Sequence, residues 1–238
     1  MAFTPRTQTT RTSSSSSSLV IDVPTGTVDG DILFLWAGLR NTAGYVINSI
    51  DPSWVLLGSS TANSDKHYLY YKIASSEPAS YTVGTTGASK FMLVMSCYTS
   101  GDFNGADPID AVSNTGYRTS NTTVRAASFN VATANSYLVF FAGMYYTSAA
   151  VTYTKPADIG TDVWTEDLDF GHTAPDFYLE ICSMLRTASG ATGDIDATAS
   201  ASSAAKHAFA VALKPAAVGG GTAVPVFMHH LNMMMENN

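Results

Sequence analysis

The chain has 238 residues, a net charge of −7 and a charged fraction of 13%, about half of the ~25% that is usual in soluble domains. This acidic balance, with no basic patch along the sequence, disfavours generic nucleic-acid binding. No apolar run reaches the ~20 residues of a membrane-spanning helix, and residues 1–18 lack the apolar core of a secretory signal, so we expect a protein made in a cytoplasm with no membrane partner.

Residues 1–18, MAFTPRTQTTRTSSSSSS, form a low-complexity arm that contains Arg6 and Arg11 and no acidic residue. Such a segment is expected to be disordered when it is alone in water. We predict that a neighbouring chain orders the arm on an acidic surface, mainly by backbone pairing as an added edge strand. Arg6 and Arg11 are therefore candidate partner-binding residues.

From Leu19 onward, short apolar runs alternate with turn segments. Ile32–Leu39 is continuously apolar, as is typical of a strand buried on both faces, and Lys90–Thr99 repeats this pattern. Lys66–Ser75 alternates loosely and is rich in tyrosine. The turns carry Gly, Pro, Asp and Ser at short intervals, a spacing that favours an all-β sandwich or barrel.

The best helix candidate is Ser200–Leu213, because it is rich in alanine. Its second part alternates, with Phe209, Val211 and Leu213 on one side, so we predict a strand.

The two cysteines, Cys97 and Cys182, lie in apolar, strand-like runs. We predict two buried free thiols, because a disulfide would require the two strands to face each other at bonding distance.

The second half of the chain echoes the first in the same order. The matching segments are ILFLWAG (32–38) with YLVFFAG (137–143), 67–83 with 177–195, and 88–95 with 204–211. We predict a body, residues 19–215, made of two related four-strand halves, 19–100 and 127–215, that folds without either terminal segment. The halves close as one jelly-roll-like β-sandwich or form two tandem small sandwiches, and we favour one compact body. Its core is expected to contain Phe34, Trp36, Phe140 and Phe141.

The body contains the phrases VPTGTVDGDILFLWAG, DPSWVLLGSS, YYKIASSEPASYTV, DPIDA and FAVALKPA. Together they resemble a family of β-sandwich proteins that is common in tailed-bacteriophage genomes and includes decoration, tail and fibre-associated proteins. The resemblance covers roughly residues 19–215 and implies a protein on the outer surface of a phage particle. The N-terminal arm and the Met-rich C-terminal tail lie outside this shared body.

Catalytic and metal-binding motifs are missing from the sequence. None of the five histidines has the spacing of a zinc site, and no nucleophile elbow or phosphate-binding loop is present. Strand alternation predicts that Asp167 and Asp169 share a face, an arrangement that fits a solvated edge, a cation site or a glycosidase pair. We favour the solvated edge and predict no enzymatic activity, no metal and no cofactor.

Aromatic and polar side chains offer a second kind of site. Tyr145 and Tyr146 are adjacent, and for such tyrosines core packing, interface contacts and glycan binding are the alternatives. Trp164, with Asp162 and Glu166 on either side, is the candidate for binding a host glycan.

Residues 216–238 consist of a Gly-rich linker and the tail VPVFMHHLNMMMENN. If the tail is helical, its apolar side chains share one face and suit a groove on another chain; an alternative is that the tail covers its own body. The candidate anchor residues are Phe227, Met228, Leu231, Met234 and Met235.

These observations lead to one functional hypothesis and one alternative. We predict a virion structural protein, a decoration or cement protein that binds the major capsid protein on the outer capsid surface after synthesis in the host cytoplasm. Closed rotational symmetry favours a homotrimer. The alternative is a tail or fibre-associated adhesin that binds a host surface glycan.

Overall fold

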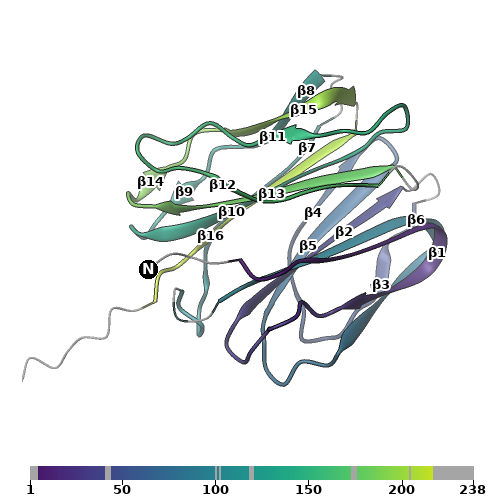
Figure 1. The fold of residues 1–238 in the computed structure, drawn as a ribbon, viewed down its shortest axis with the longest axis horizontal. Coiled ribbons are helices and arrows are strands. Elements are labelled where there is room, and N and C mark those ends of the chain that lie inside the picture. The colour runs from purple at the N-terminus through teal and green to yellow at the C-terminus, as the bar shows by residue number, and fades with distance from the viewer. Residues whose placement is uncertain are drawn as a thin grey trace, which may run out of the picture.

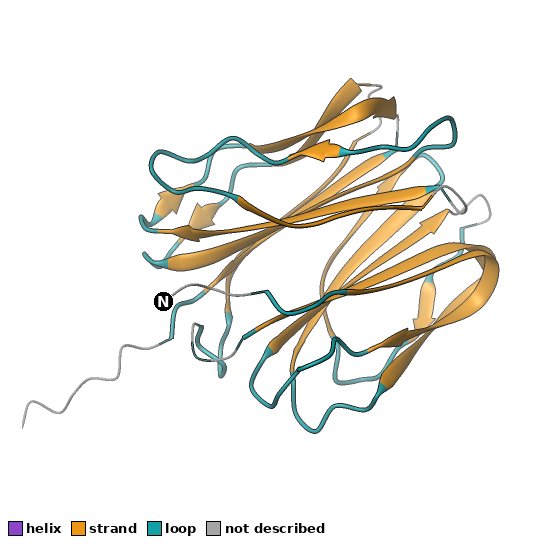
Figure 2. Ribbon diagram, viewed as in Figure 1, coloured by secondary structure: helices purple, strands orange, loops and turns teal. Residues whose placement is uncertain are grey.

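The computed structural model describes residues 5–40, 44–99, 101, 103–117, 121–172, 176–203 and 205–216. Within these ranges every regular element is a β-strand and no residue is helical (Figure 2), which confirms the all-β prediction. The described residues of Ser200–Leu213 contain strand, as predicted, and no helix.

The first large sheet comes from the first part of the chain. Its strands lie in the order β1-β6-β2-β5-β4, with β3 paired to β6, and all pairs are antiparallel. The strands are β1 (Thr9–Asp22), β2 (Ile32–Arg40), β3 (Ile47–Ser49), β4 (Val55–Ala62), β5 (Asp65–Ile73) and β6 (Ser80–Tyr98).

The second large sheet comes from the second part of the chain, in the order β12-β13-β10-β16-β7. Its strands are β7 (Ile109–Tyr117), β10 (Ser136–Tyr145), β12 (Thr165–His172), β13 (Phe177–Arg186) and β16 (Lys206–Leu213). Two smaller sheets complete the fold: β11 (Tyr153–Thr154), β15 (Ile195–Ser203) and β8 (Asn121–Ala126), and β14 (Gly190–Ala191) with β9 (Asn130–Val131).

The two large sheets stack on each other (Figure 1). The first is built from strands between residues 9 and 98 and the second from strands between residues 109 and 213, so β1 and β7 begin before the predicted halves 19–100 and 127–215. In a jelly roll, two Greek keys would supply the eight strands of a double sheet. The jelly-roll part of the prediction is therefore not confirmed, while the sandwich of antiparallel sheets is.

A central core joins the two large sheets and therefore the two halves. It contains Phe34 and Trp36 from β2 and Phe141 from β10, and the rings of Phe34 and Phe141 lie 5.6 Å apart, edge to face. Phe140 points the other way but is also fully buried. The predicted burial of all of these aromatic side chains is confirmed. Each such side chain contributes ~1.5–3 kcal/mol when it is fully buried.

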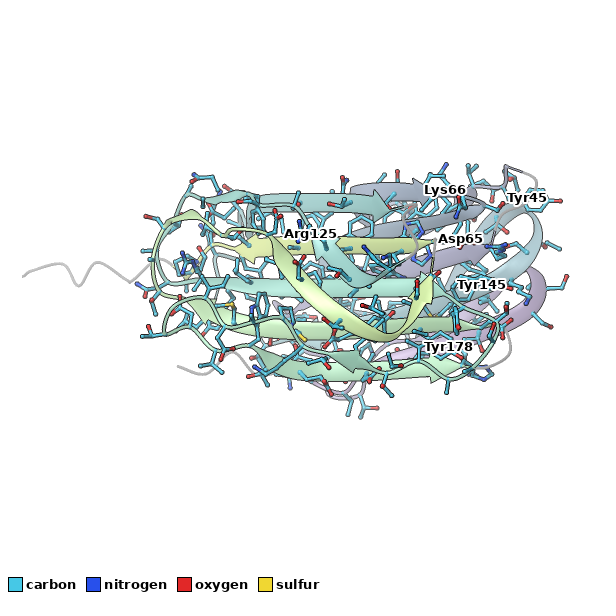
Figure 3. All side chains as sticks on the ribbon, turned by 90° about the horizontal axis from the view of Figure 1, so that it is seen from above. Tyr45, Asp65, Lys66, Arg125, Tyr145 and Tyr178 are labelled. Atoms are coloured by element: carbon cyan, nitrogen blue, oxygen red, sulfur yellow. The ribbon has the colours of Figure 1, made fainter. Side chains whose placement is uncertain are left out.

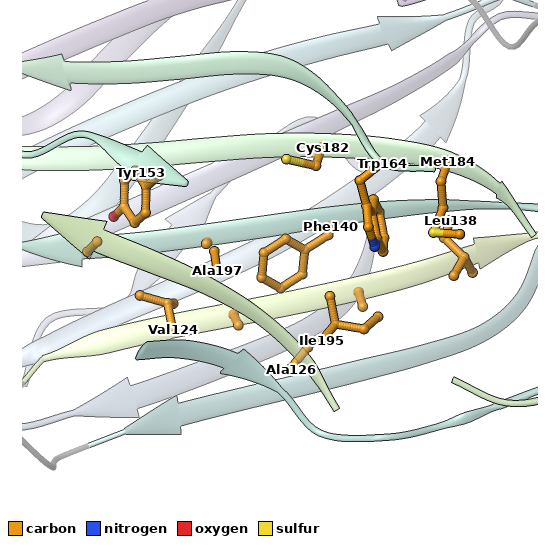
Figure 4. Packing of buried hydrophobic residues seen from close by; sticks show 14 of the residues in the cluster. Val124, Ala126, Leu138, Phe140, Tyr153, Trp164, Cys182, Met184, Ile195 and Ala197 are labelled. Atoms are coloured by element: carbon orange, nitrogen blue, oxygen red, sulfur yellow. The ribbon is translucent and has the colours of Figure 1, made fainter. Parts of the chain in front are cut away.

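Outer cores explain why β2 and β10 are apolar throughout. On the outer face of the second sheet, Phe140 and Trp164 pack beneath Ile195 of β15 and Val124 of β8 (Figure 4). Another cluster, which includes Leu35, covers the outer face of the first sheet. Because both faces of each large sheet are covered, its central strands show continuous apolar runs instead of alternation.

The serine run forms the corner of a folded strand. The register of β1 against β6 shifts between Ser13 and Ser16 and again between Ser16 and Ser18. Beyond this corner the strand returns, and Thr9 Oγ1 donates a hydrogen bond to the Asp22 carbonyl at 2.6 Å. Serine hydroxyls bond local backbone groups and so compete with the regular ladder, which helps the strand to turn.

The folded strand moves the predicted boundary between arm and body. The sequence placed that boundary between residues 18 and 19, whereas β1 crosses it and pairs along Thr9–Asp22 with the same chain. The edge strand that we expected on a neighbouring chain is thus added to the protein's own sheet, because the corner brings its start beside β6.

The described chain begins and ends at the same end of the body. Pro5 forms a bridge with Tyr98 at the end of β6, and Pro215 forms a bridge with Phe103. Ile32, where β2 begins, pairs with Tyr98 at this end. The opposite end of β2 lies roughly 26 Å away, at ~3.3 Å per residue.

Candidate functional site

The N-terminal arginines are both paired inside their own chain. Arg6 Nε donates to Oδ2 of the fully buried Asp31 at 2.7 Å, and this hydrogen bond is the main reason that the pKa of Arg6 is raised. Arg11 lies 3.2 Å from Asp22 with both side chains more than half exposed, where such a pair contributes ~0–1 kcal/mol. Of the two, Arg11 is the more exposed, and partner binding stays a prediction for both.

The C-terminal anchor also stays a prediction. Its residues lie outside the described part of the chain, which ends at residue 216. They are Phe227, Met228, Leu231, Met234 and Met235.

The segment around Trp164 does not form the exposed glycan site that the sequence indicated. Trp164 is 2% exposed and packs against Phe140, with 6.2 Å between the ring centroids (Figure 4). Asp162 is buried too and accepts hydrogen bonds from Thr187 N at 3.2 Å and Thr187 Oγ1 at 2.8 Å. Burial alone would raise the pKa of Asp162, but these bonds, together with the ion pair to Arg186 at 3.0 Å, more than offset it and the pKa is lowered. Only Glu166 of the predicted set is exposed.

A bulge separates the two aspartates that alternation places on one face, so that prediction is wrong. The register of β12 against β13 skips a residue at Asp167. Asp167 therefore faces the central core, where Tyr98 Oη donates to it at 2.9 Å. Asp169 lies on the outer face of the sheet, is exposed, and accepts a hydrogen bond from Tyr153 N at 3.1 Å. The two carboxyl groups cannot act on one substrate from opposite faces of a sheet.

Another carboxyl group, that of Glu180, is fully buried on the outer face of the second sheet. Its Oε1 accepts a hydrogen bond from Cys182 Sγ at 3.2 Å, while Oε2 has no partner in the described structure. Burial raises the pKa of Glu180 to about 7, and the charges of Glu166 and Asp169 add to this effect. Sequence reasoning missed Glu180 because it lies within the otherwise apolar run of β13.

The cysteines are as predicted. Cys97 and Cys182 are both buried and free. Burial raises the pKa of Cys97 to about 11 and also raises that of Cys182, so neither thiol is activated as a nucleophile.

Two histidines from different halves stack inside the central core. The rings of His67 and His207 lie 3.8 Å apart and 13° from parallel, and both residues are fully buried. Burial lowers the pKa of His207 to about 3, and burial followed by the proximity of His207 lowers the pKa of His67. Ser60 Oγ lies 2.5 Å from His207 Nδ1, but His207 Nε2 has no partner in the described structure. This pair lacks both the orienting acid and the access to substrate that a serine nucleophile needs.

An open cleft of about 410 Å³ lies at the end of the body where β2 and β10 finish. Figure 3 shows two residues of this region, Asp65 and Tyr145, near the same end of the molecule. Both halves of the chain line the cleft. The lining residues are Arg40, Asn63, Tyr145, Tyr146, Thr147, Ser202, Ser203 and Ala205.

Contacts between the halves fix the wall of the cleft. Arg40 Nη1 donates to Asp65 Oδ1 at 2.9 Å, and the Arg40 guanidinium carbon lies 4.3 Å from the ring centroid of Tyr145. Lys90 Nζ donates to Tyr145 Oη at 2.9 Å and to Asp176 Oδ2 at 2.7 Å. Burial raises the pKa of Asp65 to about 6, although Arg40 acts in the opposite direction. The ring of Tyr145 is thus held by two cations from the other half.

The sequence contains only a weak signal for this cleft. For the adjacent tyrosines at 145 and 146, the sequence left core packing, interface contacts and glycan binding open as alternatives. Arg40 and Asn63 are brought to them by the stacking of the two sheets, which no local pattern reveals.

No family model, no curated protein and no solved structure matches this chain. The described residues contain no helix that is long and apolar enough to cross a membrane. They also contain no cluster of three or more histidine, cysteine or acidic side chains arranged to hold a metal ion.

Proposed function

We propose that the protein is a structural component of a tailed-bacteriophage virion, a decoration protein on the outer surface of the capsid. The phrases that resemble such proteins fall on strands and turns of the body: DPSWVLLGSS spans a turn and most of β4, and FAVALKPA spans most of β16. They therefore concern the fold and its packing, and they support a shared architecture instead of a shared active site.

One observation carries the proposal: the described chain begins and ends at the same end of the body. The segments that continue from Pro5 and from residue 216 are attached there. A body with both attachments at one end is suited to being held end-on, with its terminal segments toward a supporting surface and its other end toward solvent. The major capsid protein is the proposed partner.

We further propose that the two halves are copies of one structural unit. In the first sheet the long strands β1 and β6 pair beside β2, and in the second sheet β7 and β16 pair beside β10. β8 then corresponds to the part of β1 that follows its corner, and β15 corresponds to the part of β6 that precedes its corner. This correspondence follows the sequence echo and replaces the jelly roll as the finer description of the fold.

The proposed assembly is a trimer around a symmetry axis of the shell, in which Arg11 and the C-terminal tail contact the lattice. The protein has a binding role in this proposal and neither an enzymatic activity nor a cofactor. Closed symmetry satisfies identical surfaces without open-ended growth. Native mass measurement of protein released from particles tests the trimer. A protein that is monomeric both free in solution and on the shell would contradict the proposed assembly.

The test of the proposal is binding to capsids that lack the protein. We expect the full chain to co-sediment with such capsids at a copy number that matches the lattice, and the double variant Phe227→Ser, Leu231→Ser to lose this binding. The melting temperature of the free variant should equal that of the wild type. Binding of only a few copies at the tail, or no binding to capsids, would overturn the proposed function. A lowered melting temperature with intact binding would show instead that the tail covers its own body.

A further inference from the structure

The cleft between the two halves lies at the end of the body opposite to the one where the described chain begins and ends. Arg40, at the end of β2, lines it, whereas the start of β2 pairs with Tyr98 beside the bridge to Pro5. In the proposed virion the cleft therefore faces outward. Decoration of a shell does not require such a cleft, so its role is a separate question.

We propose that this cleft binds an acidic sugar, a pyranose unit that carries a carboxylate, as found in bacterial surface polysaccharides. The cation that would receive the carboxylate is Arg40. The uncharged polar groups around it, those of Asn63, Thr147 and Ser202, suit the hydroxyl groups of the ring.

Arg40 is preorganised for this task. Asp65 holds it through Nη1, Tyr145 lies beneath its guanidinium plane, and its side chain remains 32% exposed. A guanidinium group has five N–H donors in a planar fork, and one contact to Asp65 leaves its geometry suited to a second carboxylate. Because the side chain is already positioned, a ligand does not have to order it, and the entropic cost of binding is reduced.

The charge of the lining favours an anion. None of the described residues that line the cleft is acidic, and Arg40 is the cation among them. The carboxylates of Asp65 and Asp176 lie behind the wall, each paired with a cation. The net charge of −7 on the whole chain opposes long-range attraction of anions, but at physiological salt this field is screened beyond about 8 Å.

The size and shape of the cleft favour a short segment. Its volume of about 410 Å³ is near the lower end of the ~300–1,000 Å³ that is common for ligand sites. Tyr146, which packs partly against the outer core, supplies a partly exposed ring edge on which the apolar face of a pyranose can pack. One or two sugar units therefore fit better than a longer chain.

The experiment measures binding of digalacturonic acid and of a neutral disaccharide, lactose, to the full chain by ligand-observed NMR and calorimetry. We expect digalacturonic acid to bind, with affinity that weakens as salt is raised, and lactose to bind at least tenfold more weakly. Arg40→Lys keeps a positive charge beside Asp65 but removes the planar fork, and it should weaken binding of the acidic sugar at least tenfold. Ser202→Trp fills the cleft from an exposed position and should abolish binding without a change in melting temperature.

Arg125→Gln is the matched control. Arg125 is also a partly exposed arginine paired with carboxylates, those of Asp194 and Asp196, but it lies on β8 and does not line the cleft. We expect this variant to bind like the wild type. Equal affinity for the acidic and neutral sugars, unchanged binding in both cleft variants, or no binding of the acidic sugar by the wild type would each overturn the proposal. None of these results bears on capsid binding, which is measured separately.

Discussion

The buried carboxyl group of Glu180 makes the stability of the protein depend on pH in a predictable direction. In the folded chain its pKa is raised from 4.5 to about 7, mainly because the group is buried. Between these values the folded state binds more protons than the unfolded state, so the free energy of unfolding falls as pH rises through this window. At ~1.4 kcal/mol per pKa unit, the cost above pH 7 is about 3 kcal/mol at most.

Replacing Glu180 with Gln removes the titration and keeps the shape of the side chain. The amide brings a donor into a site where Oε2 has no partner, as the protonated carboxyl group of the wild type does below pH 7. We therefore expect Glu180→Gln and the wild type to have similar stability near pH 4.5, where Glu180 is protonated. Between pH 4.5 and 7 the difference should shift in favour of the variant by about 2–3 kcal/mol.

Urea denaturation at closely spaced pH values from 4.5 to 8.5 measures this difference. Glu166→Gln is the comparison variant, because Glu166 is an exposed carboxylate on the neighbouring strand whose charge adds less to the raised pKa of Glu180 than burial does. We expect that variant to change the free energy of unfolding by less than ~0.5 kcal/mol throughout. A difference between Glu180→Gln and the wild type that stays constant with pH would refute the reasoning.

Three further predictions concern other parts of the body. The pKa values of the stacked pair His67 and His207 are lowered, so the free energy of unfolding should fall as pH drops below about 6.5. His67→Phe should reduce this acid sensitivity in denaturation curves. Deletion of residues 2–17 should lower the melting temperature of the free protein, because it removes strand pairing with β6, and an unchanged value would show that this part of β1 is dispensable. Gly143→Ala should lower the free energy of unfolding by ~1–3 kcal/mol, because its Cβ would lie 2.5 Å from the indole ring of Trp36. Gly105→Ala is the control, because the space around Gly105 is open, and thermal melts of the two variants measure the difference.

The sequence was most informative where the chain is buried on both faces. The run Ile32–Leu39 predicted a central strand, and β2 matches it, because a short, continuously apolar run between turns is typical of a strand that is covered on both sides. The sequence also contains an echo of its first part in its second, from which we predicted two related halves. Which strands share a sheet was not visible, because that depends on contacts between segments far apart in the chain.

Local features that depend on tertiary contacts were predicted less well. A one-residue bulge at Asp167 changes which face of the sheet the side chains before it occupy, relative to strict alternation. No local sequence pattern predicted this bulge. Trp164 resembled an exposed ring beside acidic residues, but the small sheet of β8, β11 and β15 covers it. The serine run indicated disorder by composition, whereas its pairing with β6 gives it a structure.

The arrangement of the strands has a mechanical consequence. β2 runs from the end of the body where the described chain begins and ends to the end that bears the cleft, and its partners β5 and β6 run antiparallel along the same line. Ladder hydrogen bonds lie across the strands. A pull applied between the two ends therefore loads many of these bonds together in shear, whereas a sideways pull would peel them one after another. A body that is held by its terminal segments and pulled at its opposite end would therefore be loaded in the direction in which its strands resist unfolding most strongly.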